Sequence, residues 1–407
     1  MSSPPWAPTA TARTRSAIRP SKRSPAPPRT AAPSATLRYR IEVPDGWDGG
    51  PLVLWAHGFR GFDDELFVGS PRDSLREQLI DEGIAWAASS YSENGYVPGI
   101  GADDTLALKQ HFVDEFGEPA EAYLVGASMG GNVVALSLEH FPGQYDGALS
   151  LCGALGGQTQ IDYLVSWARL AEYFSGLELP VGEGASETQL FDFLLNEMAP
   201  VLGAFGEPTP EGEQFLSAIR MLTGGPRPFF EEGFEDQYVT NFGFLLFDPE
   251  LESLLVRAAT NVGVEYDIEP GLGVTAEEIN EGIVRQEADP EARNAENHPD
   301  KVPTSGDITA PLLALHTTGD LFVPITQGLF YRDAVRDSGK EDMLVQRVIR
   351  APGHCTFSDE EILAGFDDLQ RWVESGERPA GSPMDGDFTD EGFDFTNPIR
   401  EGDPGAQ

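Results

Sequence analysis

The most informative feature of this chain is the pentapeptide Gly-Ala-Ser-Met-Gly at residues 126–130, which directly follows an apolar run at 122–125. Small residues around a serine, between a predicted strand and a predicted helix, indicate a sharp turn that exposes the Ser128 hydroxyl. Such a turn is the usual support of a nucleophilic serine. The pentapeptide alone is not decisive, because glycine-rich loops with one serine have many uses. A nucleophile also needs a base, a carboxylate that orients the base, and donors for an oxyanion.

Position along the chain favours His354 as the base among the six histidines. It lies in a Pro-Gly-His-Cys turn just after an apolar strand predicted at 344–349. The other histidines lie in helical, strand-like or acidic segments, apart from His57, which ends a strand predicted at 51–57. A histidine in a loop at the carboxyl end of a strand is well placed to reach a serine on the same edge of a parallel sheet.

The orienting acid is expected after the preceding strand, predicted at 311–316, where the sequence reads Thr-Thr-Gly-Asp and ends at Asp320. Two alternatives remain at this point. Asp320 could only form the turn after its glycine, and Asp307 could be the acid, although it precedes the strand and so lies at the wrong end of the sheet. The predicted order along the chain is serine, aspartate, histidine.

The segment His57-Gly58-Phe59 supplies a candidate oxyanion donor. Gly58 would let the backbone approach a substrate closely, and we expect the amides of Phe59 and Met129 to donate to the oxyanion. The alternative is an ordinary turn with a hydrogen-bonded His57.

These four elements, in this order and in these strand–loop contexts, resemble the α/β-hydrolase superfamily, in particular its esterases and prolyl-oligopeptidase-like enzymes. The resemblance covers residues 37–157 and 306–376. It implies an α/β fold in which a mostly parallel sheet is flanked by helices, and a Ser128–His354–Asp320 triad that works without a cofactor or a metal.

The remaining segments differ from this core. Residues 158–305 are helical and amphipathic, and we predict a helical cap inserted between the sixth and seventh core strands, with an independent interaction domain as the alternative. Residues 1–36 are basic, rich in Pro, Ser and Ala, and predicted to be disordered. Residues 377–407 form an acidic tail rich in Gly and Pro, which is either solvated or loosely attached through its phenylalanines.

Charge is the second informative property. The chain has 67 acidic and 27 basic residues, a net charge of −40, and its four lysines are Lys22, Lys109, Lys301 and Lys340. This charge disfavours nucleic acids and anionic membranes as partners and resembles that of proteins from salt-accumulating halophiles. An acidic exported protein is the alternative. No apolar run is long enough to span a membrane, and no signal peptide is readable, so the compartment and the oligomeric state stay open.

Cys152 and Cys355 both map to the carboxyl edge of the predicted sheet. A disulfide could brace the histidine loop, somewhat as in tannase-like enzymes, but Cys152 does not adjoin the serine in the sequence. We therefore expect two buried free thiols.

Ester hydrolysis through an acyl-enzyme is the first functional hypothesis, with a small-molecule ester as substrate. An amidase or a peptidase of the prolyl-oligopeptidase-like type is the second, because esters and amides share this machinery. A non-catalytic binding scaffold is the third, and the complete set of three residues argues against it.

Overall fold

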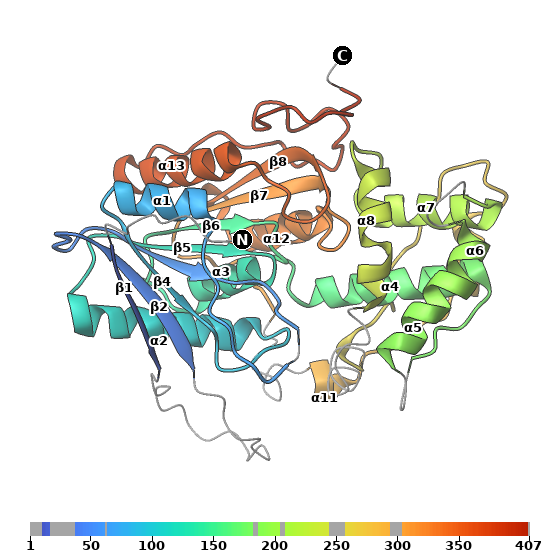
Figure 1. Cartoon of the computed structure of the whole chain (residues 1–407). Coiled ribbons are helices and arrows are strands. Elements are labelled where there is room, and N and C mark those ends of the chain that lie inside the picture. Colours follow the sequence, from blue (N-terminus) through green and yellow to red (C-terminus); the bar gives the residue numbers. More distant parts are fainter. Residues whose placement is uncertain are drawn as a thin grey trace, which may run out of the picture.

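A computed structural model describes residues 10–16, 37–61, 63–181, 186–203, 208–243, 257–293 and 303–405. These residues form an eight-stranded sheet between two layers of helices, with a further group of helices beside it (Figure 1). The strands are β1 (Ala10–Ser16), β2 (Arg38–Pro44), β3 (Leu52–Ala56), β4 (Ala85–Ser89), β5 (Ala122–Ala127), β6 (Gly147–Leu151), β7 (Leu312–Gly319) and β8 (Leu344–Pro352). Their order is β1-β2-β4-β3-β5-β6-β7-β8, and the strands from β4 to β8 in this order run parallel.

The continuous apolar sequences of the central strands explain why the sheet is covered on both faces. All five residues of β3 are buried, and their side chains alternate between two cores. Leu52 and Leu54 belong to the core beneath α2 and α3, whereas Val53 and Trp55 belong to the core beneath α1 and α13. A strand buried on both faces is typical of a parallel sheet.

Among the described residues, five helices flank the sheet. α1 (Asp73–Asp81) and α13 (Asp359–Ser375) cover one face, and α2 (Pro98–Phe116), α3 (Met129–His140) and α12 (Thr326–Asp337) cover the other (Figure 1). The predicted fold class, a mostly parallel α/β sheet flanked by helices, is confirmed.

The edge of the sheet differs from the prediction. Residues 1–36 are predicted to be disordered, but Ala10–Ser16 form β1, which pairs antiparallel with the outer edge of β2. An edge strand presents a row of unpaired N–H and C=O groups, and an extended chain can satisfy them without apolar side chains. The absence of a hydrophobic pattern therefore did not exclude a strand. The rest of 1–36 lies outside the described residues.

The segment between β6 and β7 is helical where the structure describes it. It contains α4 (Gln158–Ser175), α5 (Glu187–Phe193), the π-helical turn η1 (Leu194–Met198), α6 (Ala199–Leu202), α7 (Pro210–Leu222), α8 (Phe230–Gly243), α10 (Ala276–Gly282) and α11 (Pro290–Arg293). Trp167 of α4 packs against Phe215 of α7 and Phe234 of α8, so an aromatic core holds these helices together. Figure 1 shows the group next to the carboxyl ends of β7 and β8.

The C-terminal segment is attached to β8 rather than solvated. Phe388 is buried, and the fully buried Arg350 of β8 forms a bidentate ion pair with Asp403 at 2.6 and 2.7 Å. Arg350 also lies over the ring of Phe393, and Arg347 lies over that of Phe395. The segment thus covers the outer strand of the sheet and is held there by arginines of β8. The sequence did not predict this role for them.

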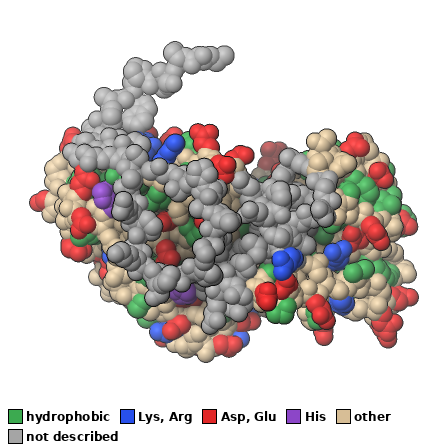
Figure 2. Space-filling model, turned by 90° about the horizontal axis from the view of Figure 1, so that it is seen from below, with side chains coloured by type: hydrophobic (Ala, Val, Ile, Leu, Met, Phe, Trp, Pro, Cys, Tyr) green, Lys and Arg blue, Asp and Glu red, His purple; other side chains and the backbone are tan. Residues whose placement is uncertain are grey.

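The surface is acidic, as the composition requires. On the face shown in Figure 2, acidic side chains are spread widely and basic ones are few. Among the described helices, none combines the length and the apolar character that a membrane crossing needs.

Candidate active site

Ser128 lies in a sharp turn between β5 and α3, with φ = 59° and ψ = −124°. The glycines of the pentapeptide are required by close backbone contacts. A Cβ atom on Gly126 would come within 2.2 Å of the carbonyl oxygen of Gly130, and one on Gly130 within 2.1 Å of that of Ala56. The sequence thus forces the backbone into a conformation that non-glycine residues seldom adopt, and Ser128 adopts it.

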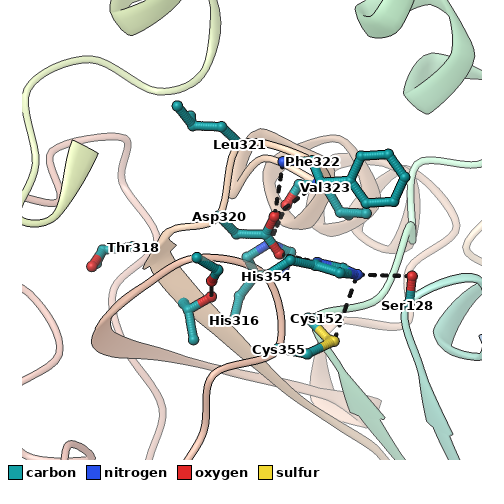
Figure 3. A network of polar contacts seen from close by, with 12 residues as sticks. Ser128, Cys152, His316, Thr318, Asp320, Leu321, Phe322, Val323, His354 and Cys355 are labelled. Atoms are coloured by element: carbon teal, nitrogen blue, oxygen red, sulfur yellow. Dashed lines mark hydrogen bonds and ion pairs between the residues drawn. A yellow bond between two sulfur atoms is a disulfide. The ribbon is translucent and has the colours of Figure 1, made fainter. Parts of the chain in front are cut away.

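His354 connects Ser128 with Asp320, as Figure 3 shows. Its Nε2 lies 2.9 Å from Oγ of Ser128, and its Nδ1 lies 2.5 Å from Oδ2 of Asp320. A neutral imidazole with its proton on Nδ1 would donate to the carboxylate and accept from the serine hydroxyl. The structure therefore brings together the three side chains predicted from the sequence, which lie in three separate loops.

Asp320 combines the two roles that the sequence left as alternatives. It is fully buried. Its Oδ1 accepts hydrogen bonds from the amides of Phe322 (3.0 Å) and Val323 (2.8 Å), which forms the turn, while Oδ2 accepts from His354. Asp307 instead pairs with Lys340 at 3.3 Å on the surface. The carboxylate at the carboxyl end of β7 is thus the one that reaches the histidine.

Gly58 brings the loop after β3 against the serine. A Cβ atom on Gly58 would lie 3.1 Å from Cβ of Ser128 and 3.6 Å from its Oγ, so this position favours glycine. Met129 is the first residue of α3, and its sulfur accepts a hydrogen bond from the amide of Val97. Phe59 follows Gly58 and is partly buried. These contacts place both segments beside Ser128, and the oxyanion role of the Phe59 and Met129 amides stays a prediction.

His57 is a buried residue of this same loop. Its ring stacks on Tyr91 with centroids 3.9 Å apart, and Nδ1 donates to the carbonyl oxygen of Gly58 at 2.7 Å. Burial lowers the pKa of His57 to about 4, because an imidazolium is poorly solvated there. A neutral His57 thus supports the loop.

Cys152 and Cys355 form a disulfide, which corrects the expectation of two free thiols. Their Cα atoms lie 5.3 Å apart. The reason lies in the sheet register, because Ala127 of β5 pairs with Leu151 of β6 and the amide of Ser128 donates to the carbonyl of Leu151. Cys152 is therefore beside the serine in space, although 24 positions separate them in the sequence.

The helical segment contacts the loop that bears Asp320. The hydroxyl of Tyr163 and the side-chain amide of Asn241 both donate to the carbonyl oxygen of Leu321, at 2.5 and 2.9 Å. The amide of Leu321 donates to Gln237, and the buried Arg227 donates to the carbonyl of Thr318 at 2.8 Å. These polar residues were not identified from the sequence, since nothing local shows which residue of a helical insertion faces the core domain.

Arg72 supports the loop that carries His354. Its guanidinium donates to the carbonyl oxygens of Cys355 (2.9 Å) and Phe357 (2.7 Å). The loop that carries His354 is thus held by the disulfide and by these two hydrogen bonds. The donor atoms of Cys152, Cys355 and His354 lie close enough together to share a metal ion. In this structure both sulfurs are bonded to each other in the disulfide.

No protein-family model matches the chain. The o-phthalyl amidase of Xanthobacter agilis is 21% identical to it over an alignment that covers 85% of this chain and 87% of the amidase. Among solved structures, feruloyl esterase B from Aspergillus oryzae is similar with a TM-score of 0.50 and 13% identity, over 89% of this chain and 82% of the esterase. An acylaminoacyl peptidase from Pyrococcus horikoshii has a TM-score of 0.47 and 11% identity, over 91% of this chain and 43% of the peptidase.

The sheet order, the helices on both faces and the similarity to the esterase structure agree with one another. The serine turn after β5 and the loops after β7 and β8 meet at the carboxyl edge of that sheet. The chain has the α/β-hydrolase fold.

Proposed function

We propose that this protein is a serine hydrolase that cleaves a carboxylic ester through an acyl-enzyme intermediate. The hydrogen-bonded series Ser128–His354–Asp320 is the observation that carries this proposal. A histidine that accepts from a serine and donates to a buried carboxylate has the arrangement needed to activate a nucleophile.

The proposed reaction uses these contacts. His354 takes the proton of Ser128 as Oγ attacks the carbonyl carbon of the substrate, and Asp320 stabilises the imidazolium that forms. The amides of Phe59 and Met129 stabilise the oxyanion. His354 then gives the proton to the leaving group, and a water molecule activated by the same histidine releases the acyl group. The helical segment, which contacts the Asp320 loop, acts as a cap that excludes bulk water.

An amidase is the second candidate function. The relative with 21% identity is named o-phthalyl amidase and aligns over most of both chains, which favours an amide bond next to an aromatic acyl group. The same triad serves both bonds, so the leaving group decides between the two functions.

The test is a set of matched p-nitrophenyl esters and p-nitroanilides that share one acyl group, assayed in molar KCl. Acetyl, butyryl, benzoyl and o-carboxybenzoyl groups cover the acyl chemistry of both candidates. Ser128→Ala should lower kcat by about 10⁴–10⁶-fold, because the nucleophile is lost. The exposed Ser375 supplies the matched control, and Ser375→Ala should keep full turnover.

Ester turnover that exceeds anilide turnover for the same acyl group supports the esterase, and the reverse supports the amidase. Turnover retained by folded Ser128→Ala protein contradicts both. A folded wild-type protein that hydrolyses none of these compounds would favour the non-catalytic scaffold.

A further inference from the structure

The disulfide adjoins the ring nitrogen of His354 that contacts the serine. Sγ of Cys355 lies 3.6 Å from Nε2 of His354, the atom that is also 2.9 Å from Oγ of Ser128 (Figure 3). The two sulfurs and the histidine donor lie within 4.8 Å of one another. We propose that opening the Cys152–Cys355 disulfide creates a binding site for a divalent cation such as Zn²⁺, which withdraws His354 from Ser128.

The donor set fits such an ion, as does the spacing between Cys355 and His354. Thiolates and imidazole are the ligands that Zn²⁺ prefers in proteins. Zinc–sulfur bonds of about 2.3 Å and zinc–nitrogen bonds of about 2.0 Å, at a tetrahedral angle, separate sulfur from nitrogen by about 3.5 Å. The separation of Cys355 Sγ and His354 Nε2, 3.6 Å, is close to this value. Two cysteines and one histidine leave a fourth position for water or for the Ser128 hydroxyl.

The other ring nitrogen of His354 is arranged as in a zinc site. Nδ1 donates to the buried carboxylate of Asp320, and histidine ligands of zinc commonly donate their second N–H to a carboxylate. The contact that orients the base toward Ser128 would therefore also orient it toward a metal ion.

Contacts other than the disulfide hold both cysteines in place. The amide of Cys152 donates to the carbonyl oxygen of Leu315 at 2.8 Å, and Arg72 donates to the carbonyl of Cys355. Both cysteines adopt positive φ, 47° for Cys152 and 60° for Cys355. These non-covalent contacts keep the sulfurs near His354 after the covalent bond is broken.

A reductant can approach from the side of Cys355. This residue is partly exposed, whereas Cys152 is fully buried. A cavity of about 190 Å³ adjoins Cys355, with Trp55, Arg72 and Leu151 among its lining residues. A dithiol would attack the Cys355 sulfur, and the S–S bond would take up two electrons and two protons to give two thiols as the dithiol becomes a disulfide. The ion then binds the two thiolates and releases their protons.

The binding test uses Ser128→Ala protein, so that it does not depend on catalysis. The protein is reduced with a phosphine, which becomes a phosphine oxide, then desalted without oxygen and titrated with Co²⁺ as a spectroscopic probe. We expect one Co²⁺ per chain with sulfur-to-cobalt charge-transfer absorption, and displacement of that ion by Zn²⁺. Three matched samples should lack this absorption or bind more weakly. The oxidised protein and the double variant Cys152→Ser/Cys355→Ser should lack it, and His354→Ala should bind at least about 10–100-fold more weakly, the loss typical of a single supporting partner.

Reduced protein of the correct mass and fold that shows no charge-transfer absorption would overturn the proposal. Equal absorption in the double cysteine variant would also overturn it, as would a disulfide that resists reduction in the folded protein. The inhibition rests on the proposed hydrolase function and is measured separately. Turnover by reduced wild-type protein should be lost with one equivalent of Zn²⁺ and restored by a chelator, while oxidised protein is unaffected. If no hydrolysis is found, the Co²⁺ titration still decides whether the site exists.

Discussion

His57 and His354 both follow strands at the carboxyl edge of the sheet, but the surroundings of their rings differ. His354 lies between a serine hydroxyl and a carboxylate. His57 stacks on Tyr91, and no carboxylate among the described residues forms an ion pair with it. Burial lowers the pKa of His57 to about 4, and its hydrogen bond to the carbonyl of Gly58 opposes this only in part. The His354 ring is therefore placed for proton transfer, whereas the neutral His57 ring supports the loop that contacts Ser128.

This difference predicts a pH dependence of stability. The pKa of His57 is lower in the folded protein than the ordinary value of 6.5, so the unfolded chain binds the proton more readily. The stability that neutral His57 contributes is fully present above about pH 6.5 and is lost as the pH falls toward 4, by about 3 kcal/mol in all. Chemical denaturation at several pH values measures this loss.

His57→Asn is the matched control, because its amide retains a donor near Nδ1 and does not titrate. Wild-type protein should lose about 3 kcal/mol more than this variant between pH 7 and pH 4. Parallel curves for the two proteins would show that the His57 ring is not buried in its neutral form.

The C-terminal segment stabilises the strand that leads to His354. Asp403 pairs with the fully buried Arg350 of β8, and the hydrogen bonds from this guanidinium lower the pKa of Asp403. Arg400 pairs with Glu361 at the start of α13, at 2.7 Å, and also donates to the carbonyl of Thr356 in the histidine loop. The segment therefore connects β8, the histidine loop and α13.

Asp403→Asn should lower the free energy of unfolding by about 3–5 kcal/mol, because it leaves the buried Arg350 charge without its partner. Asp390→Asn removes the same charge from an exposed position of the same segment and should change stability by less than about 0.5 kcal/mol. Denaturant titration of the two variants gives the comparison. Equal effects would mean that the ion pair does not hold the segment on β8.

The sequence predicted these elements unequally. β5, β7 and β8 and the loops after them were predictable, because the serine, the aspartate and the histidine each follow their own apolar run closely in the chain, with a glycine nearby. The disulfide was not, because Cys152 reaches Ser128 through the register of β5 and β6. β1 was not predictable either, because it pairs through its backbone. The attachment of the C-terminal segment depends on Arg350, and the sequence of β8 does not distinguish this arginine from the other residues of the strand.

For the whole molecule, charge is the dominant property. A net charge of −40 predicts self-repulsion that favours the unfolded chain unless salt screens it. The thermal unfolding midpoint should rise between about 0.05 M and about 1 M KCl, where the Debye length falls to about 3 Å. Sucrose is the control, because it stabilises folded proteins without screening charge. A midpoint that rises with sucrose but not with KCl would show that the acidic residues repel one another too weakly to matter.

The proposed role of Ser128 as a nucleophile activated by His354 can be tested by covalent labelling, without knowledge of the substrate. The folded protein is treated with a fluorophosphonate, and the modified peptide is located by mass spectrometry. We expect one adduct, on Ser128, with labelling abolished in Ser128→Ala and strongly slowed in His354→Ala, because the histidine no longer accepts the serine proton. A folded protein that stays unlabelled, or that carries its adduct on another residue, would contradict the proposed active site.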